Sequence, residues 1–246
     1  MESCLDPLFE SIFPIIFYDE KDLVNVAGTS ILVEHKGQNY LLTAAHVLKD
    51  PGSKYHLYVL LRGKAVHLHD PAFMSKIQKT DIDTAFFPLA FHPTLETHLT
   101  GYKTITLKEY DGDITYSREH YFVFGFPWRR AKFNRTDKEL NARPLQYFTD
   151  IIDDSSLFSK YNRPKESHIL VQYNPKTTTN RNKIKQLAPH PHGISGGPLF
   201  KALINDRDEV ILLILEGLLI EWKDSRVIVA TKKEKIRNFI DGKPLH

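Results

Sequence analysis

Short apolar runs separated by turn residues recur along the whole chain, and this pattern constrains the fold more than any other feature. The expected strands span residues 29–34, 40–43, 55–61, 65–68, 84–89, 103–107, 121–125, 168–173, 198–200, 209–215 and 226–230. The sequence has no internal repeat and no low-complexity segment. Repeated short strands with turn signals between them predict an all-β barrel or sandwich, not alternating βα units.

Helices are expected only near the two ends of the chain. The first dozen residues favour a short helix, and residues 232–240 fit an amphipathic helix with Ile236, Phe239 and Ile240 facing inward. Residues 129–165 are charged and poorly periodic. They predict an inserted loop or flap, and a plain surface insertion is an equally good interpretation.

The sequence GISGGP at residues 193–198 places Ser195 among small residues. A serine hydroxyl is a poor nucleophile at neutral pH, so it needs a neighbouring base and a site that holds the developing oxyanion. The glycines at 193, 196 and 197 permit unusual backbone dihedrals and let N–H groups approach a substrate carbonyl. Taken alone, the segment is equally well explained as a tight turn.

A histidine and an aspartate occur in equally distinctive settings. His46 follows the apolar run and small residues of YLLTAAHVL, at residues 40–48. Asp83 opens the apolar stretch of DIDTAFFPL, at residues 81–89, and Asp81 is the competing carboxylate. A carboxylate at a strand edge can accept the imidazole N–H and fix the tautomer that a general base needs. The alternative for His46 is a structural histidine at the end of a strand.

These motifs resemble those of the trypsin/chymotrypsin-like serine proteases, in particular their disulfide-free bacterial branch. The matching segments are Thr43-Ala44-Ala45-His46, Asp83-Thr84-Ala85 and Gly193-Ile194-Ser195-Gly196-Gly197-Pro198, in the order that the family has. Weaker matches are Gly28-Thr29-Ser30 and Phe124-Gly125-Phe126-Pro127. The resemblance extends from about residue 25 to the C-terminus.

The resemblance implies two six-stranded Greek-key β-barrels packed together, followed by a C-terminal helix. The whole chain, 1–246, would be one peptidase domain with an N-terminal barrel over about 1–95, a C-terminal barrel over about 96–246, and a join near 91–101. Ser195 would be the nucleophile, His46 the general base and Asp83 its orienting partner. The backbone N–H groups of Gly193 and Ser195 would form the oxyanion hole. This chemistry requires neither a metal nor an organic cofactor.

Ile194 marks a departure from the animal digestive members, which usually carry an aspartate directly before the nucleophile. That aspartate pairs with a new N-terminus released by zymogen cleavage, and an isoleucine cannot do so. Activation by N-terminal insertion is therefore not expected. The remaining alternatives are ordering of the Ser195 loop, a regulatory protein partner, or the substrate itself.

Substrate recognition is expected around the nucleophile and along a later strand. The segment Glu216-Gly217-Leu218 should lie beside the substrate, so that a peptide adds as an extra β-strand. His190 and His192 could contact a carboxylate or amide side chain, and exposed loop residues are the alternative interpretation. Glu216 and Glu221 could favour a basic substrate residue, but strand alternation turns only some of them inward.

Composition and charge indicate the cellular compartment and the class of partner. The single cysteine, Cys4, excludes an intrachain disulfide and favours a reducing compartment. No signal peptide or membrane-spanning stretch is apparent, so a cytoplasmic protein with a protein or peptide substrate is expected. The net charge of +3 is too small to indicate a nucleic-acid partner.

Several weaker motifs have plainer explanations. His67 and His69 would share a strand face and could contribute to a metal site, but a solvated face is the better interpretation. The basic clusters at 128–130, 181–185 and 232–233 fit a solvated surface better than a nucleic-acid site. The two leading hypotheses are an active serine endopeptidase and a protease-like binding module with little turnover.

Overall fold

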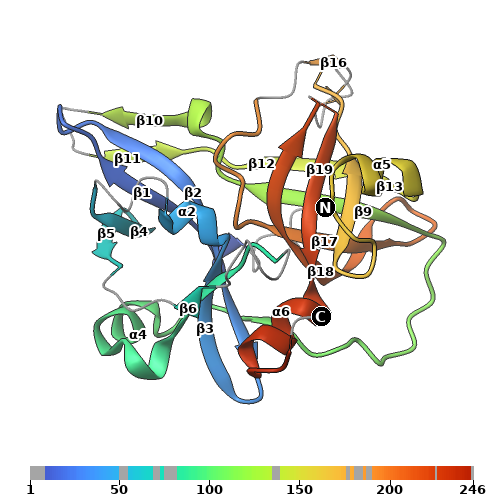
Figure 1. Ribbon diagram of the computed structural model, residues 1–246, viewed down its shortest axis with the longest axis horizontal. Helices are drawn as coiled ribbons and strands as arrows, with labels where there is room; N and C mark the ends of the chain where they lie inside the picture. The colour runs from blue at the N-terminus through green and yellow to red at the C-terminus, as the bar shows by residue number, and fades with distance from the viewer. Residues whose placement is uncertain are drawn as a thin grey trace.

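The computed structural model describes residues 9–49, 55–68, 73–74, 82–134, 139–175, 178–179, 185–186, 190–224 and 226–244. Two large β-sheets, one from each half of the sequence, stand side by side (Figure 1). The expected all-β class with a C-terminal helix is confirmed.

The first sheet contains eight strands among the described residues, with β5-β4-β1-β2-β3-β7-β6 as neighbours and β8 beside β2. Their bounds are β1 (Ile12–Tyr18), β2 (Val24–His35), β3 (Gln38–Thr43), β4 (Leu57–Leu61), β5 (Lys64–His67), β6 (Phe73–Met74), β7 (Ala85–Pro88) and β8 (Ile105–Thr106). The pairings are antiparallel except that of β2 with β8.

The second sheet contains seven strands among the described residues, in the order β12-β9-β17-β18-β19-β14-β13. Their bounds are β9 (Arg118–Gly125), β12 (Leu145–Thr149), β13 (Ile151–Ile152), β14 (His168–Gln172), β17 (Pro198–Ile204), β18 (Val210–Lys223) and β19 (Val227–Lys232). All of these pairings are antiparallel. The expected strands 198–200 and 209–215 are thus the beginnings of the longer strands β17 and β18.

Strand β1 was not among the expected strands. The predicted helix over the first dozen residues falls mostly outside the described residues, and the chain is already extended from Ile12. Residues 12–16 are all buried, so the segment lacks the alternation that identifies a strand with one face in water. Ile12, Phe13 and Ile15 belong to three different core clusters, so both faces of β1 are covered by protein.

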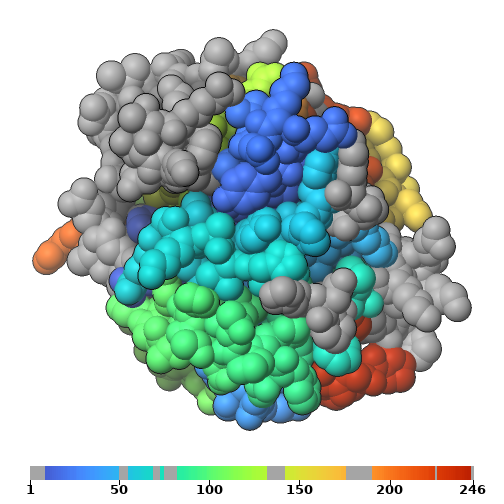
Figure 2. All heavy atoms as spheres, turned by 90° about the vertical axis from the view of Figure 1, so that its left-hand side faces the viewer, coloured from blue at the N-terminus to red at the C-terminus, as the bar shows by residue number. Residues whose placement is uncertain are grey.

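The helices are short and lie at the edges of the sheets. They are α2 (Ala45–Lys49), α4 (Pro93–Leu99), α5 (Ser155–Lys160) and α6 (Lys233–Ile240), together with the 3-10 turns η1 (Leu89–Phe91) and η2 (Trp128–Arg130). Helix α6 confirms the predicted C-terminal helix, since Ile236 is fully buried and Phe239 and Ile240 pack against the core. Helix α4 and strands β4 and β5 form neighbouring parts of one face (Figure 2).

The chain passes from the first sheet to the second between β8 and β9. This crossing lies later in the sequence than the expected join at 91–101, because that segment forms α4 and Leu95 and Leu99 pack into the core of the first sheet. One core cluster joins the two sheets: it contains Ile31 and Leu42 from the first and Phe122 from the second.

The segment 129–165, expected to be an inserted loop, contains regular structure. It holds the hairpin of β10 (Ala131–Asn134) and β11 (Glu139–Ala142), the sheet strands β12 and β13, and α5. The hairpin reaches back from the second half and contacts β2 (Figure 1). A second hairpin pairs β15 (Thr178–Thr179) with β16 (Lys185–Gln186). Edge strands and hairpins carry few buried apolar residues, so their periodicity is weak in the sequence.

Candidate active site

His46 and Asp83 contact each other at two points. The backbone N–H of His46 donates to Oδ1 of Asp83 at 3.0 Å, and Nδ1 of the imidazole lies 2.5 Å from Oδ2. His46 is at the start of α2, just after β3, while Asp83 directly precedes β7, the antiparallel neighbour of β3. The side chain of Asp83 is 12% exposed and that of His46 is 32% exposed. The carboxylate therefore fixes both the backbone and the ring of His46, and Nδ1–H is the donor when Asp83 is ionised.

The Ser195 turn is attached to β2, which lies beside β3. The backbone N–H of Thr29 donates to the Ser195 carbonyl oxygen at 2.8 Å, and the hydroxyl of Thr43 donates to the Thr29 carbonyl oxygen at 2.8 Å. These bonds connect Ser195 of the second half to the end of β3, three residues before His46. The three residues that the sequence motifs singled out are thus held by one network of neighbouring strands.

Thr29 also fixes the preceding part of the turn. Its hydroxyl donates to the carbonyl oxygen of Gly193 at 2.9 Å and accepts from the backbone N–H of Phe126 at 2.9 Å. This threonine is fully buried. The Gly28-Thr29-Ser30 match, which was weak as a sequence signal, therefore marks a residue that connects three separate chain segments.

Gly196 permits the closest approach between the two halves. Its φ is +87°, and a Cβ built on it would lie 2.0 Å from the Thr29 carbonyl oxygen and 2.4 Å from the Thr43 hydroxyl. Both the positive φ and the missing side chain are therefore needed here. Gly193 has φ +100° and similarly approaches the backbone of Phe126, at 2.7 Å from a built Cβ.

The backbone around Ser195 leaves two N–H groups unengaged. The carbonyl oxygens of His192 and Gly193 accept from Trp128 N–H and from the Thr29 hydroxyl, so both are turned into the protein. In the described part of the chain, neither the N–H of Gly193 nor that of Ser195 donates a hydrogen bond. Two free N–H groups on either side of Ile194 are what binding of an oxyanion requires.

The strand beside Ser195 lies further along β18 than expected. The backbone N–H of Gly196 donates to the Leu219 carbonyl oxygen at 2.7 Å. The backbone N–H of Leu219 donates to the Gly197 carbonyl oxygen at 2.8 Å. The Ser195 hydroxyl donates to the Ile220 carbonyl oxygen at 3.4 Å. The residues of β18 that contact the Ser195 turn are thus Leu219 and Ile220, which follow the segment 216–218 that was predicted to lie beside a substrate.

Residues 216–218 are packed within the protein instead. Leu218 is fully buried in the core cluster, and a Cβ on Gly217 would lie 2.5 Å from the Thr231 carbonyl oxygen. Burial raises the pKa of Glu216, whose charged neighbours include Lys201 and Lys233. The position of Ser195 along β18 is set by the pairing of β18 with residues 196–197, a long-range register that the apolar run 210–220 does not reveal.

His190 and His192 precede the Ser195 turn, and their rings lie against two tryptophans. The His190 and Trp222 rings are 4.4 Å apart and nearly perpendicular, and the His192 and Trp128 rings are 5.9 Å apart. Both histidines are exposed. Partial desolvation of the His190 ring, together with the charges of Arg129 and His192, nevertheless lowers the pKa of His190. Trp222, which the sequence motifs did not single out, follows Ile220 by two residues and forms part of this aromatic group.

Ile194 occupies an apolar environment. Its side chain is 4% exposed and belongs to a core cluster of the second sheet with Tyr173, Leu199 and Leu219. A Cβ on Gly125 would lie 2.7 Å from Cβ of Ile194, so the glycine of the Phe124-Gly125-Phe126-Pro127 segment makes room for it. The residue before Ser195 is thus anchored by packing and not by an ion pair.

The weaker candidate residues of the sequence lie away from the Ser195 turn or outside the described residues. Asp81, His69 and Cys4 lie outside the described residues. His67 contacts His56, with 3.2 Å between Nε2 of His67 and Nδ1 of His56. No group of three or more metal-binding side chains occurs among the residues that the structure covers. Within the same residues, no helix is long and apolar enough to cross a membrane.

The basic clusters are dispersed. Arg129 and Arg130 belong to η2, while Lys233 is buried and forms an ion pair with Glu109 at 2.9 Å. The residues 181–184 lie outside the described chain. Of the described residues in these clusters, Lys233 is therefore not free to bind an external partner.

Comparisons with known proteins connect this geometry to a fold. No protein-family model matches the sequence, and no curated protein sequence matches it. Among solved structures, the inactivated protease paralogue S-I1 of the scabies mite is similar over 96% of both chains, with a TM-score of 0.54 and 15% identity. The protein GrC is similar over 95% of this chain and 93% of its own, with a TM-score of 0.51 and 13% identity. The chain therefore has the two-barrel fold of the trypsin-like proteases.

Proposed function

We propose that the protein is a serine endopeptidase that cleaves peptide bonds through Ser195, His46 and Asp83. The observation that carries this proposal is the two-point contact of Asp83 with His46, on strands that also hold the Ser195 turn. A carboxylate that receives both the backbone N–H and Nδ1 leaves Nε2 of the imidazole as the base.

In the proposed reaction, the Ser195 hydroxyl attacks the carbonyl carbon of a peptide substrate. His46 takes the hydroxyl proton and then gives it to the leaving amine, which leaves an acyl-enzyme. Water, activated by His46, attacks the ester carbonyl and releases the acid and free Ser195. Asp83 keeps the imidazole in the tautomer with Nδ1 protonated and stabilises its positive charge.

The oxyanion of each tetrahedral intermediate would bind the N–H groups of Gly193 and Ser195. Their lack of other acceptors in the described chain, and the positive φ of Gly193, support this role. Each such donor typically contributes about 2.7–4 kcal/mol to the stabilisation of the transition state.

A peptide substrate would extend along residues 220–222 of β18, with His190, His192 and Trp222 near its side chains. The contacts between Ser195 and Ile220 and between His190 and Trp222 support this location over 216–218. The buried Ile194 supports regulation without N-terminal insertion, through loop ordering, a protein partner or the substrate. The single cysteine supports a cytoplasmic location, as in the disulfide-free bacterial branch.

The second candidate is a protease-like binding module. It is favoured by the hydrogen bond of the Ser195 hydroxyl to Ile220, and the similar scabies mite protein is described as an inactivated protease paralogue. A module freed from catalysis has no need of Asp83, yet the carboxylate and both of its contacts to His46 are present.

A peptide-library cleavage screen with matched variants distinguishes the two candidates. We expect cleavage by the unaltered protein, no detectable turnover for Ser195→Ala, and a loss of about 10⁴-fold in kcat for Asp83→Asn, which removes the tautomer control. Thr97→Val, on the exposed face of α4, is the control that should retain full activity. Equal cleavage by the Ser195→Ala variant would contradict the proposal.

A further inference from the structure

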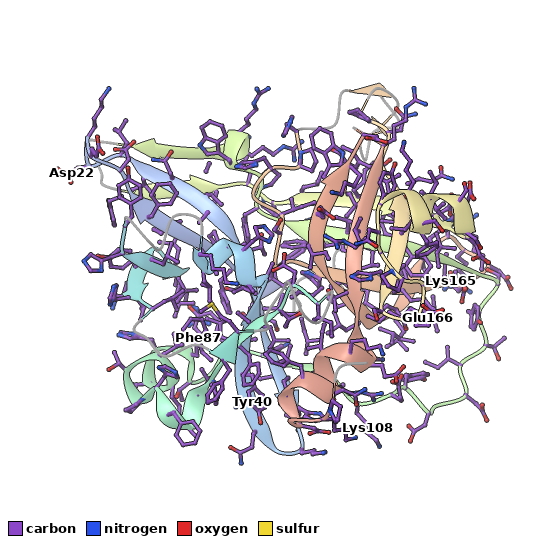
Figure 3. All side chains as sticks on the ribbon, viewed as in Figure 1. Asp22, Tyr40, Phe87, Lys108, Lys165 and Glu166 are labelled. Carbon is purple, nitrogen blue, oxygen red and sulfur yellow. The ribbon has the colours of Figure 1, made fainter. Side chains whose placement is uncertain are left out.

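A cavity of about 620 Å³ lies on the first half of the molecule, between the β3–β7 pair and α6. Its lining is dominated by five aromatic rings, those of Tyr40, Phe73, Phe86, Phe91 and Phe239. Figure 3 shows Tyr40 next to α6, whereas Phe87, the neighbour of Phe86, lies toward α4. The volume is within the range of small-molecule sites, and the lining is of the kind that binds apolar ligands.

Phe86 forms the centre of the aromatic lining. Its ring is stacked on Phe73 with centroids 5.2 Å apart, and it meets Tyr40 and Phe239 edge-on at 5.7 Å and 5.2 Å. Phe86 is nearly fully buried, so its position is fixed by packing. The cavity therefore has a rigid aromatic floor built from β3, β7 and α6.

The rim of the cavity leaves apolar surface in water. Phe91 is 74% exposed and Phe73 is 50% exposed, the two most exposed phenylalanines of the described chain. Exposed aromatic side chains that lie together indicate a binding site, because apolar surface in water is unfavourable and a bound ligand would cover it. A ligand that entered the cavity would cover both rings.

The same rim carries positive charge. Lys243 lines the cavity and lies 3.6 Å from Asp241, which also binds Lys36 at 2.8 Å. Two ammonium groups thus share one carboxylate, and one positive charge remains without a negative counterpart in this group. Lys243 is 60% exposed, so its ammonium group can reach a ligand at the opening of the cavity.

We infer that this cavity is a binding site for an amphipathic carboxylate, with an apolar chain against the aromatic rings and its carboxylate at Lys243. The combination of apolar lining and a single surplus cation at the opening matches that ligand class. The inference does not depend on the proposed peptidase activity, because neither Ser195 nor His46 lines the cavity.

Titration calorimetry of the full chain with decanoate, and with uncharged decanol, tests the assignment. We expect decanoate to bind about fivefold or more tightly than decanol. Lys243→Glu should weaken decanoate binding by about fivefold or more and leave decanol unaffected. Phe91→Ala should weaken both ligands by about tenfold, because the exposed ring loses its contact with the chain.

The matched controls are Lys108→Glu and Phe148→Ala. Both residues are exposed and neither lines the cavity, so these variants should bind both ligands like the unaltered protein. Absence of decanoate binding would overturn the inference. Decanoate binding that the control variants weaken as much as Lys243→Glu and Phe91→Ala do, or that none of the four variants changes, would also overturn it. Equal affinity for decanoate and decanol would contradict the role of Lys243.

Discussion

Ser195 depends on glycine at the next position. Gly196 combines a positive φ with a backbone approach to β2 that leaves no room for a methyl group. The GISGGP segment indicated flexible glycines from its composition, but the close neighbours of Gly196 are Thr29 and Thr43, more than 150 residues earlier in the sequence. The sequence therefore predicts which residues matter here, and only the packed structure explains why Thr29 is one of them.

Gly196→Ala tests this close approach. We expect the variant to lower the free energy of unfolding by more than the ~1–2 kcal/mol that a left-handed alanine costs, because the Thr29 carbonyl must also move. Gly37→Ala is the matched control: its φ is +77°, and a Cβ there meets no atom within 4 Å. Chemical denaturation of both variants measures the difference. Equal destabilisation by the two substitutions would show that the turn can relax.

At the level of elements, short apolar runs between turn signals predicted several strands without any help from alternation. The runs at 40–43 and 121–125 identified β3 and β9, in which residues 41–43 and 121–125 are all buried, while β1, equally buried over residues 12–16, was not among the expected strands. For β18, the run was recognised but its register was not, since two irregularities in its pairing with β17 shift the residues that face Ser195. Helix α6 was predicted correctly because its apolar face is regular.

Helix α6 is tied to the first sheet by Asp241. The carboxylate binds Lys36 at 2.8 Å and His35 at 3.0 Å. Hydrogen bonds from the Lys36 and His35 side chains lower the pKa of Asp241 from 3.8 to about 2. A lowered pKa means that the folded protein favours the ionised form, so the contribution to stability is full above pH 3.8 and is lost as the pH falls toward 2.

Asp241→Asn should therefore lower the free energy of unfolding by about 1 kcal/mol near neutral pH, a value reduced by the exposure of Lys36. The difference from the unaltered protein should decrease between pH 4 and pH 2, which brackets the two pKa values. Denaturation curves across this range provide the measurement, with Asp208→Asn as an exposed control. A difference that stays constant through acid pH would exclude the ionised carboxylate as its cause.

In the whole molecule, a shared core and backbone hydrogen bonds hold the two sheets together around the candidate site. The shared core cluster contains side chains from both sheets and from α6, and the Ser195 turn is bonded to β2. The two-barrel architecture followed from the order of the sequence motifs through their family resemblance. The crossing between the sheets and the hairpin that contacts β2 could not be inferred, because they depend on contacts between distant segments.

This shared core predicts that the two halves unfold together. Leu41→Ala removes a fully buried side chain from a cluster made only of first-half residues, and should cost about 2–5 kcal/mol. Both tryptophans, Trp128 and Trp222, lie in the second half. Their fluorescence transition should therefore shift to lower denaturant by the same amount as the circular dichroism transition. An unchanged fluorescence transition would mean that the halves are independent.

The central claim is that Ser195 is a nucleophile activated by His46 and Asp83. Covalent labelling of the full-length protein with a serine-directed fluorophosphonate, located by peptide mass spectrometry, tests it most directly. We expect one labelled residue, Ser195, with labelling abolished in the Ser195→Ala variant and strongly slowed in His46→Ala, while both variants keep the circular dichroism spectrum of the folded protein. A folded protein that remains unlabelled, or one labelled equally well without His46, would contradict it.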